Sequence, residues 1–220
     1  MPFSSSGANR VAKADRFSLM PIGDSRTAGN GSTALGGYKI QLFRLLQDHL
    51  GHAPSFCGTD QAGTCFLPNC AVSGLHSTQI LSAVTAQSPL FPGCKIYLID
   101  AGTNDVIAGT ATATTTGNIL SMISQIYTDN PNATVIVANL YDRSGKEAEI
   151  TAFNTALATA VAGHAKYSAT PAIGKCFNYD QYSVIGPYGA GTLYGDVTHL
   201  NAAGYTVAAN GWYNQIITLY

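Results

Sequence analysis

Charged residues are scarce in this chain of 220 residues, and neither sign of charge predominates. Only 10% of the residues are Asp, Glu, Lys or Arg, and the formal net charge is −1. The sequence has no cluster of Lys and Arg, which is the feature that phosphate backbones and anionic lipid surfaces require. We therefore expect neither nucleic acid nor a membrane as a partner.

Long apolar runs are also missing. The longest runs, such as residues 134–140, have the length of a buried strand and fall far short of the roughly 20 residues of a membrane-spanning helix. The N-terminus lacks the continuous apolar region of a signal peptide. With 46% hydrophobic residues the composition is globular. We expect residues 1–15 to form a flexible segment and residues 16–220 to form a single domain.

Cysteines are few, and their spacing gives no metal-binding pattern such as C-x-x-C. Close loop cysteines favour one or two disulfides, with buried free thiols as the alternative. The sequence does not choose a pairing among Cys57, Cys65, Cys70, Cys94 and Cys176. Together with the low charge and two N-x-[ST] sequons, at Asn30 and Asn132, these cysteines predict a secreted protein whose signal peptide is absent from this chain.

Apolar periodicity alternates between strand-like and helix-like segments. Strands are expected at 17–22, 95–99, 134–140 and 172–177, and helices at 38–50, 77–86, 116–127, 147–165 and 201–219. Strands separated by helices predict βαβ units with helices on both faces of a parallel sheet. The expected fold is therefore α/β: a three-layer α/β/α sandwich with a central, mainly parallel sheet.

Several chemically useful side chains follow predicted strands. Ser25 follows the first strand, Asn104 follows the second, and a loop over residues 179–198 follows the last. Ligands of such folds bind outside the carboxyl ends of the strands, so these residues are expected at one edge of the sheet.

A serine hydroxyl needs an imidazole to accept its proton and a carboxylate to orient that imidazole. The segment GDVTHLNAAGY supplies Asp196 and His199, three residues apart. On its own this pair can equally be a helix cap beside an ordinary histidine. His76 is the other candidate base, but no carboxylate accompanies it at short spacing.

Two further segments can stabilise negative charge on oxygen. Asn104 in AGTNDV can donate its amide to a developing oxyanion, although an Asx turn is the simpler interpretation. Gly74 in NCAVSGLHSTQI lies in a loop before a helix, where its backbone N–H can be a further donor.

These four segments, in this order, resemble the SGNH or GDSL hydrolases: GDS at Ser25, a glycine block at Gly74, G-x-N-D at Asn104, and D-x-x-H at Asp196 and His199. The resemblance implies that the central, mainly parallel sheet is five-stranded, as in a flavodoxin-like fold. It also implies that Ser25 is the nucleophile, His199 the general base and acid, and Asp196 the orienting carboxylate. It implies an oxyanion hole formed by the backbone N–H groups of Ser25 and Gly74 and the Asn104 side chain, with Asp24 as a turn stabiliser.

Within this superfamily, LMPIGDS, GYKIQLFRLL, SG-x-x-x-x-QI and H-x-N-x-x-GY are most similar to carbohydrate esterase family 3, whose members are acetylxylan esterases. The implied substrate is an acetyl ester on a plant polysaccharide, hydrolysed through an acyl-serine without a metal or an organic cofactor. We expect a monomer.

The chain also departs from the family pattern. Arg26 stands where Ile or Leu is usual, and either recognises an acidic sugar or pairs with a nearby carboxylate. Leu200 stands where many members have Pro, and residues 57–70 form an insertion without an obvious counterpart. Three tyrosines either stack on sugar rings or are half-buried in their loop: Tyr182, Tyr188 and Tyr194.

Other functions remain as alternatives. A lipase, thioesterase or lysophospholipase would share the fold and the chemistry, but no amphipathic lid or long apolar loop is evident near Ser25. A non-catalytic carbohydrate-binding protein would bind sugar without hydrolysis. Nucleotide binding is disfavoured because GNGSTALGG has neither G-x-G-x-x-G nor a P-loop spacing.

Overall fold

The computed structural model describes residues 17–32, 36–61, 67–189 and 192–220. In this part of the chain, six strands form one sheet in which every strand pair is parallel. The strands are β1 (Ser18–Gly23), β2 (Ser55–Phe56), β3 (Cys70–Ala71), β4 (Ile96–Asp100), β5 (Thr134–Ala138) and β6 (Cys176–Tyr179). The expected flexible segment, residues 1–15, lies outside the described residues.

The order across the sheet is β2-β1-β4-β5-β6, and β3 also pairs with β1. β2 pairs with the first half of β1 at Ser18 and Leu19, whereas β3 pairs with its last two residues, Ile22 and Gly23. Two strands of two residues each therefore share one edge position, so the six strands occupy the five positions that we expected.

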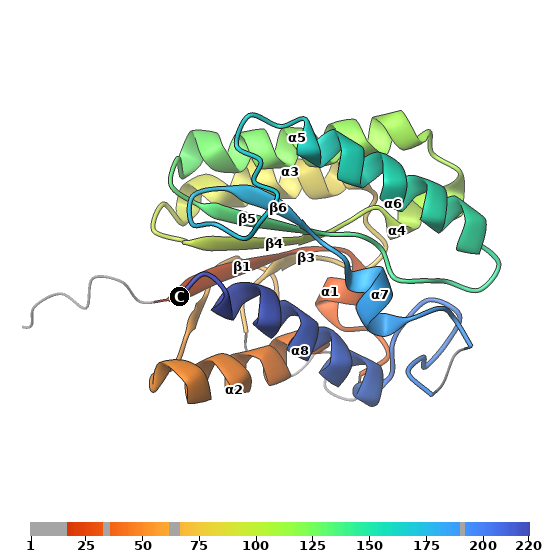
Figure 1. Ribbon diagram of the computed structural model, residues 1–220, viewed down its shortest axis with the longest axis horizontal. Helices are drawn as coiled ribbons and strands as arrows, with labels where there is room; N and C mark the ends of the chain where they lie inside the picture. Colours follow the sequence, from red (N-terminus) through yellow and green to blue (C-terminus); the bar gives the residue numbers. More distant parts are fainter. Residues whose placement is uncertain (1–16, 33–35, 62–66, 190–191) are drawn as a thin grey trace, which may run out of the picture.

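Helices cover both faces of the sheet (Figure 1). One face carries α3 (Ser77–Gln87), α4 (Thr103–Ala108), α5 (Thr112–Asp129) and α6 (Glu147–Ala162), and the other carries α2 (Tyr38–Leu50) and α8 (Ala202–Ile217). Three shorter helices are α1 (Ser25–Ala28), the 3₁₀ helix η1 (Ser88–Leu90) and α7 (Gln181–Ile185). The predicted three-layer α/β/α fold is confirmed.

Alternation along the strands produces two hydrophobic cores. Met20 and Ile22 of β1 face the core beneath α3, α5 and α6, whereas Leu19 faces the core beneath α2 and α8. The same alternation occurs in β4 and β5, because successive side chains of a strand point to opposite faces. The sheet is thus the common wall of both cores.

Helix ends follow local chemistry. α2 ends where Gly51 adopts a φ of 67°, and α8 begins where the Asn201 side chain accepts a hydrogen bond from Gly204 N at 3.0 Å. The predicted last strand was wrong at its start, because β6 begins only at Cys176. No helix in the described ranges is long and apolar enough to cross a membrane.

The disulfide expectation is not met by the cysteines that the structure describes. Cys57, Cys70, Cys94 and Cys176 are buried free thiols. All four pack in the core beneath α3, α5 and α6, where they serve as small apolar side chains. Cys65 lies outside the described residues.

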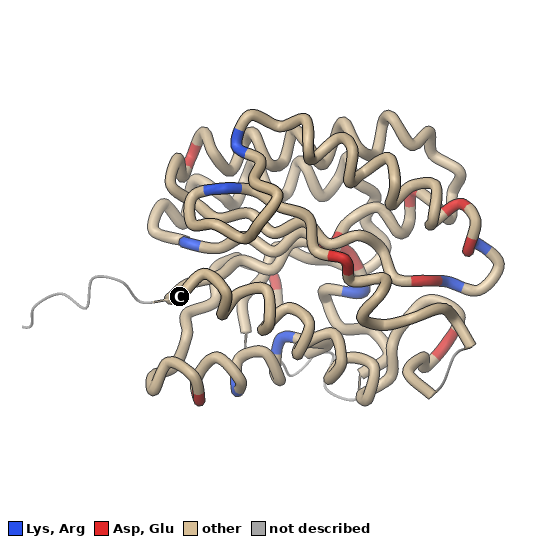
Figure 2. Tube along the Cα trace, viewed as in Figure 1, with Lys and Arg blue, Asp and Glu red and all other residues tan. Residues whose placement is uncertain are grey.

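Charged residues of both signs are scattered over the described trace, without a long run of one sign along any helix (Figure 2). This distribution agrees with the low and balanced charge of the sequence.

Candidate active site

A tight turn at the end of β1 holds Ser25. Gly23 is required there, because a Cβ on this residue would collide with the Asp100 carbonyl oxygen and the Thr27 side chain. Asp24 then caps the four-residue helix α1 by accepting a hydrogen bond from Arg26 N at 3.0 Å. Ser25 is therefore the first residue of α1, at the carboxyl end of a central strand, with a side chain that is largely buried.

His199 contacts Ser25 across 174 positions of sequence. Its Nε2 lies 2.9 Å from Ser25 Oγ, and its Nδ1 lies 2.8 Å from Asp196 Oδ2. The second Asp196 oxygen accepts hydrogen bonds from the backbone N–H groups of Thr198 and His199, both at 2.7 Å. One carboxylate thus fixes the His199 ring and the loop that carries it.

The Asp196 carboxyl has a pKa below its usual range. Burial opposes its ionisation, but hydrogen bonds from the His199 ring and from the backbone N–H groups of His199 and Thr198 outweigh that effect. Asp196 is consequently an anion at neutral pH, as is required to stabilise positive charge on the imidazole.

The expected oxyanion donors lie on neighbouring segments. Gly74 adopts a φ of 83°, a region that favours glycine, and the space around its Cα is open. The Asn104 amide donates to the carbonyl oxygen of Leu75 at 2.9 Å, which fixes the Asn104 side chain beside the Gly74 turn. The amide has a second N–H that can bind an oxyanion.

Further hydrogen bonds tie the Gly74 turn to its surroundings. Ser77 donates both its backbone N–H and its hydroxyl to the Asp105 carboxylate, each at 2.8 Å. On the other side of the turn, Ser73 donates to the side chain of Asn30 at 2.9 Å. His76 caps α3 and lies 3.8 Å from Asp105, and it is His199 that contacts Ser25.

Contact with an acidic substrate and pairing with a carboxylate were the two alternatives for Arg26, and its burial contradicts the first. Its side chain has no exposed surface. The guanidinium donates to the carbonyl oxygens of Tyr141 at 2.9 Å and Asp142 at 3.2 Å, and its central carbon lies 3.7 Å from the Tyr141 ring centroid. The charge of Arg26 acts on the nearby carboxyls of Asp24 and Asp100, in agreement with the pairing alternative, but the guanidinium hydrogen bonds go to backbone carbonyls.

The three tyrosines of interest are half-buried in the structure. Tyr194 donates to the carbonyl oxygen of Gly186 at 3.2 Å, and its ring meets those of Tyr141 and Tyr188 edge-on. Tyr182 is the second residue of α7 and packs against the core beneath α3, α5 and α6. Packing within the fold therefore occupies much of these rings, and contact with a sugar stays a prediction.

Two buried carboxylates lie behind the nucleophile. Burial raises the pKa of Asp24, which the charge of Arg26 partly opposes. Burial likewise raises the pKa of Asp100 to about 7, with the neighbouring Asp24 adding to the rise. One oxygen of each carboxylate has no hydrogen-bond partner among the described residues. The sequence did not predict Asp100 as part of the site.

The sequence did not predict Lys39 as part of the site either. It is fully buried on α2, and its ammonium donates to the carbonyl oxygens of Thr27 and of Ala28, the latter at 3.1 Å. These carbonyls belong to the end of α1, and a helix of four residues cannot satisfy its own carbonyl groups. Lys39 therefore supplies a donor to carbonyl groups that α1, because it is so short, leaves without a partner inside the helix.

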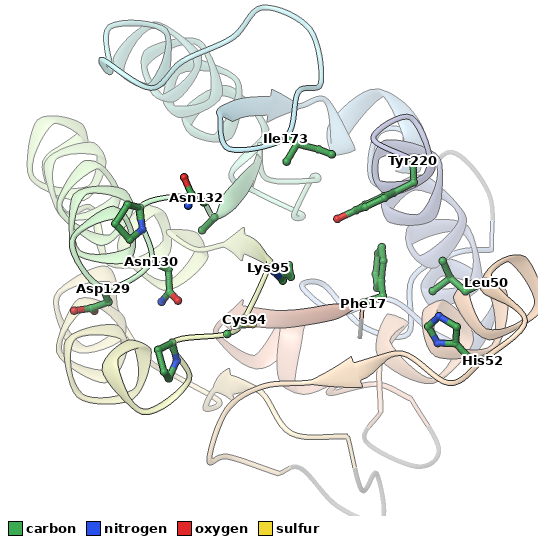
Figure 3. A pocket seen from close by; sticks show the side chains of 14 residues that line it. Phe17, Leu50, His52, Cys94, Lys95, Asp129, Asn130, Asn132, Ile173 and Tyr220 are labelled. Carbon is green, nitrogen blue, oxygen red and sulfur yellow. The ribbon is translucent and has the colours of Figure 1, made fainter. Parts of the chain in front are cut away.

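A cavity of about 610 Å³ lies at the other end of the strands, where β1 and β4 begin. It is lined by Phe17 and Lys95 near the start of β1 and β4, and by Asn130, Ile173 and Tyr220 (Figure 3). Ser25 follows the carboxyl end of β1, so this cavity is separate from the candidate active site.

A parallel α/β sheet that presents a Ser–His–Asp set at its carboxyl edge has the arrangement of a serine hydrolase. A family model for the GDSL-like lipase/acylhydrolase family matches residues 22–207. The chain belongs to this family, and the resemblance inferred from its four motifs is confirmed. A search of curated protein sequences found no match.

Solved structures with the same fold include carbohydrate esterases of family 3. A family 3 carbohydrate esterase of Clostridium thermocellum aligns with a TM-score of 0.72 at 24% identity, over 92% of this chain and 96% of that chain. A family 3 carbohydrate esterase from Talaromyces cellulolyticus aligns with a TM-score of 0.71 at 19% identity, over 92% and 97%. TesA aligns with a TM-score of 0.69 at 18% identity, over 92% and 99%. At these identities, the similarity shows the fold alone.

Proposed function

We propose that the protein is a serine esterase that hydrolyses short-chain esters, with O-acetyl groups on xylan or a related polysaccharide as its substrate. The observation that carries this proposal is the bonding of one imidazole to two partners: His199 lies 2.9 Å from the Ser25 hydroxyl and 2.8 Å from Asp196. This geometry suits transfer of a proton from the hydroxyl to the ring.

In the proposed reaction, Ser25 Oγ attacks the ester carbonyl carbon while His199 Nε2 accepts the hydroxyl proton. The N–H groups of Ser25 and Gly74 and the Asn104 amide would bind the negative oxygen of the tetrahedral intermediate. The bond to the sugar oxygen then breaks as the imidazolium donates its proton to that oxygen, so the sugar departs with a free hydroxyl and acetyl-Ser25 remains. Water, deprotonated by His199, attacks this ester, and acetic acid leaves as the proton returns to Ser25 Oγ; the acid then ionises to acetate in solution.

The acetyl group and the polysaccharide are the finer part of the proposal. Similarity to family 3 carbohydrate esterases, in motifs and in fold, supports them. The loop that carries Asp196 and His199 is open to solvent, since the Asp196 side chain is 53% exposed. Such an open loop also suits a bulky sugar. Secretion and a monomeric state are predictions that accompany a polysaccharide substrate.

The test compares p-nitrophenyl esters of increasing acyl length, together with acetate release from acetylated xylan. We expect kcat/KM to be highest for the acetyl ester and to fall steeply with chain length, and acetate to be released from xylan. A preference for long acyl chains would instead indicate a lipase or thioesterase, and sugar binding without hydrolysis would indicate a binding protein.

Ser25→Ala is the essential control. Removing the nucleophile of such a triad costs at least about 10⁴-fold in kcat, so the variant should have almost no turnover on any ester. Near-parental activity in a correctly folded Ser25→Ala protein would show that the proposed mechanism is wrong.

A further inference from the structure

Arg26 connects the nucleophile turn to the loop between β5 and α6. It follows Ser25 directly, and its guanidinium donates to two successive carbonyl oxygens of that loop, those of Tyr141 and Asp142. The ring of Tyr141 packs against the guanidinium face. A charged side chain with no exposed surface, one residue after the nucleophile, requires a role other than solubility.

The same β5–α6 loop is bonded to the segment that carries the base. Asp142, itself buried, accepts a hydrogen bond from Tyr188 N at 3.0 Å. Arg143 Nε donates to Thr198 Oγ1 at 3.1 Å, and Ser144 N donates to the carbonyl oxygen of Val197 at 3.1 Å. Thr198 is the residue before His199.

A continuous series of contacts thus runs from the nucleophile to the base by a route other than their direct hydrogen bond. It passes from Arg26 to the β5–α6 loop, and from there to residues 197 and 198. Aromatic packing runs parallel to it, from Tyr141 to Tyr194 and from Tyr194 to Tyr188.

Resting on the proposed function, we propose that Arg26 is a positioning residue that sets the placement of His199 relative to Ser25 by clamping the β5–α6 loop to the nucleophile turn. The planar guanidinium suits this role, because two of its N–H groups point at successive carbonyls while its face stacks on a ring. An ammonium can neither present this fork nor stack in the same way. The aliphatic residue usual at this position offers no donor at all.

The first experiment replaces Arg26 by Met, which retains much of the volume, and by Lys, which retains the charge. For p-nitrophenyl acetate we expect both variants to lose kcat by about 10²-fold, because a displacement of about 1 Å has that effect on a positioned reaction. We expect KM to change by less than about threefold, since acetyl-ester binding does not involve the buried clamp.

A spectroscopic readout reports on position directly. In the parent protein, the hydrogen bond from His199 Nδ1–H to Asp196 should give a downfield imidazole proton resonance. This resonance should shift or broaden in both Arg26 variants. A role in stability alone would leave it unchanged in the folded protein.

Two control variants separate positioning from stability. Arg44→Met makes the same chemical change at an exposed site on α2, and Ile123→Ala lowers stability within the core of α5. Both should keep the parental kcat and resonance at temperatures below their unfolding transitions, and all assays are made at such temperatures.

A variant at the far end of the series keeps the proposal testable if both Arg26 variants fail to fold. Thr198→Val removes the acceptor for Arg143 at a partly exposed site, and should reduce kcat by about fivefold with little change in KM. Parental kcat in Thr198→Val, or full activity in a folded Arg26→Lys protein, would overturn the clamp. Neither result would affect the proposed esterase, which depends on Ser25→Ala.

Discussion

At the scale of single residues, the candidate site depends on ionisable side chains held away from water. Arg26 and Lys39 are fully buried, and Asp24 and Asp100 are buried beside Arg26. Buried charges are costly unless they are hydrogen-bonded or neutralised. The two cations bind backbone carbonyls at the end of α1 and in the β5–α6 loop, whereas the raised pKa of Asp100, about 7, makes its charge change near neutral pH.

Asp100 should make the stability of the protein depend on pH. Its pKa is about 7 in the folded protein and about 4 in an unfolded chain. Between about pH 4 and pH 7, the Asp100 carboxyl is therefore protonated in the folded state and ionised in the unfolded state. Its contribution to the free energy of unfolding is complete below about pH 4 and is lost as the pH rises to about 7. Denaturant unfolding measured from pH 4 to 8 should show this fall.

Asp100→Asn should make that fall smaller, because an amide does not titrate. Asp48→Asn, which makes the same change at an exposed site on α2, should keep the parental dependence. An unchanged profile in Asp100→Asn would mean that Asp100 is not the group responsible.

At the scale of elements, α2 is a support for the helix that begins with Ser25. The carbonyl oxygens of Thr27 and Ala28 accept from the Lys39 ammonium, and α1 ends at Gly29, which has a φ of 105°. A Cβ on Gly29 would collide with the backbone of Gly37, just before α2. The nucleophile turn thus lies directly against the start of α2.

Lys39→Met should destabilise both the protein and the turn. It leaves two buried carbonyl groups without this donor, which should lower the free energy of unfolding by about 1–3 kcal/mol. Loosening of α1 should lower kcat as well, and this can be measured with p-nitrophenyl acetate at a temperature where the variant is folded.

Lys39→Arg is the matched comparison, because it restores a donor of the same charge in a larger shape. A partial recovery of stability is expected. If Lys39→Met were as stable as the parent, the Lys39 hydrogen bonds to α1 would be of no energetic importance.

Motif order and helix periodicity made much of the fold and site predictable, whereas short elements and buried charges were not. The bounds of α2 were predicted because a strong apolar stripe precedes Gly51. β2 and β3 are too short to show any alternation. Lys39 and Arg26 were missed as interior residues because a charged side chain ordinarily indicates the surface.

At the scale of the whole molecule, both cores share one sheet. The single tryptophan, Trp212, is fully buried in the core beneath α2 and α8, between the rings of Tyr38 and Tyr179. The other core has its own helices but the same strands. Loss of either core would expose one face of the sheet, so we expect the two to unfold together.

Trp212 fluorescence tests this coupling. Fluorescence reports on one core, whereas far-UV circular dichroism reports on all helices, so a single cooperative transition should give coincident curves in denaturant. Loss of esterase activity should follow the same curve. Fluorescence that changes at a lower denaturant concentration than circular dichroism would show that the α2–α8 layer detaches first.

The edge position that β2 and β3 share affects how the segment between these two strands can vary in sequence. The chain pairs with β1 through β2 as far as Phe56 and pairs with it again through β3 from Cys70. An antiparallel bridge between Asp60 and Asn69 joins the two ends of the segment between β2 and β3. The segment between β2 and β3 can therefore change in length or composition without shifting the register of either strand on β1. Because β3 leads directly into the Gly74 turn, the register of β3 on β1 also holds a candidate oxyanion donor in place when this segment varies.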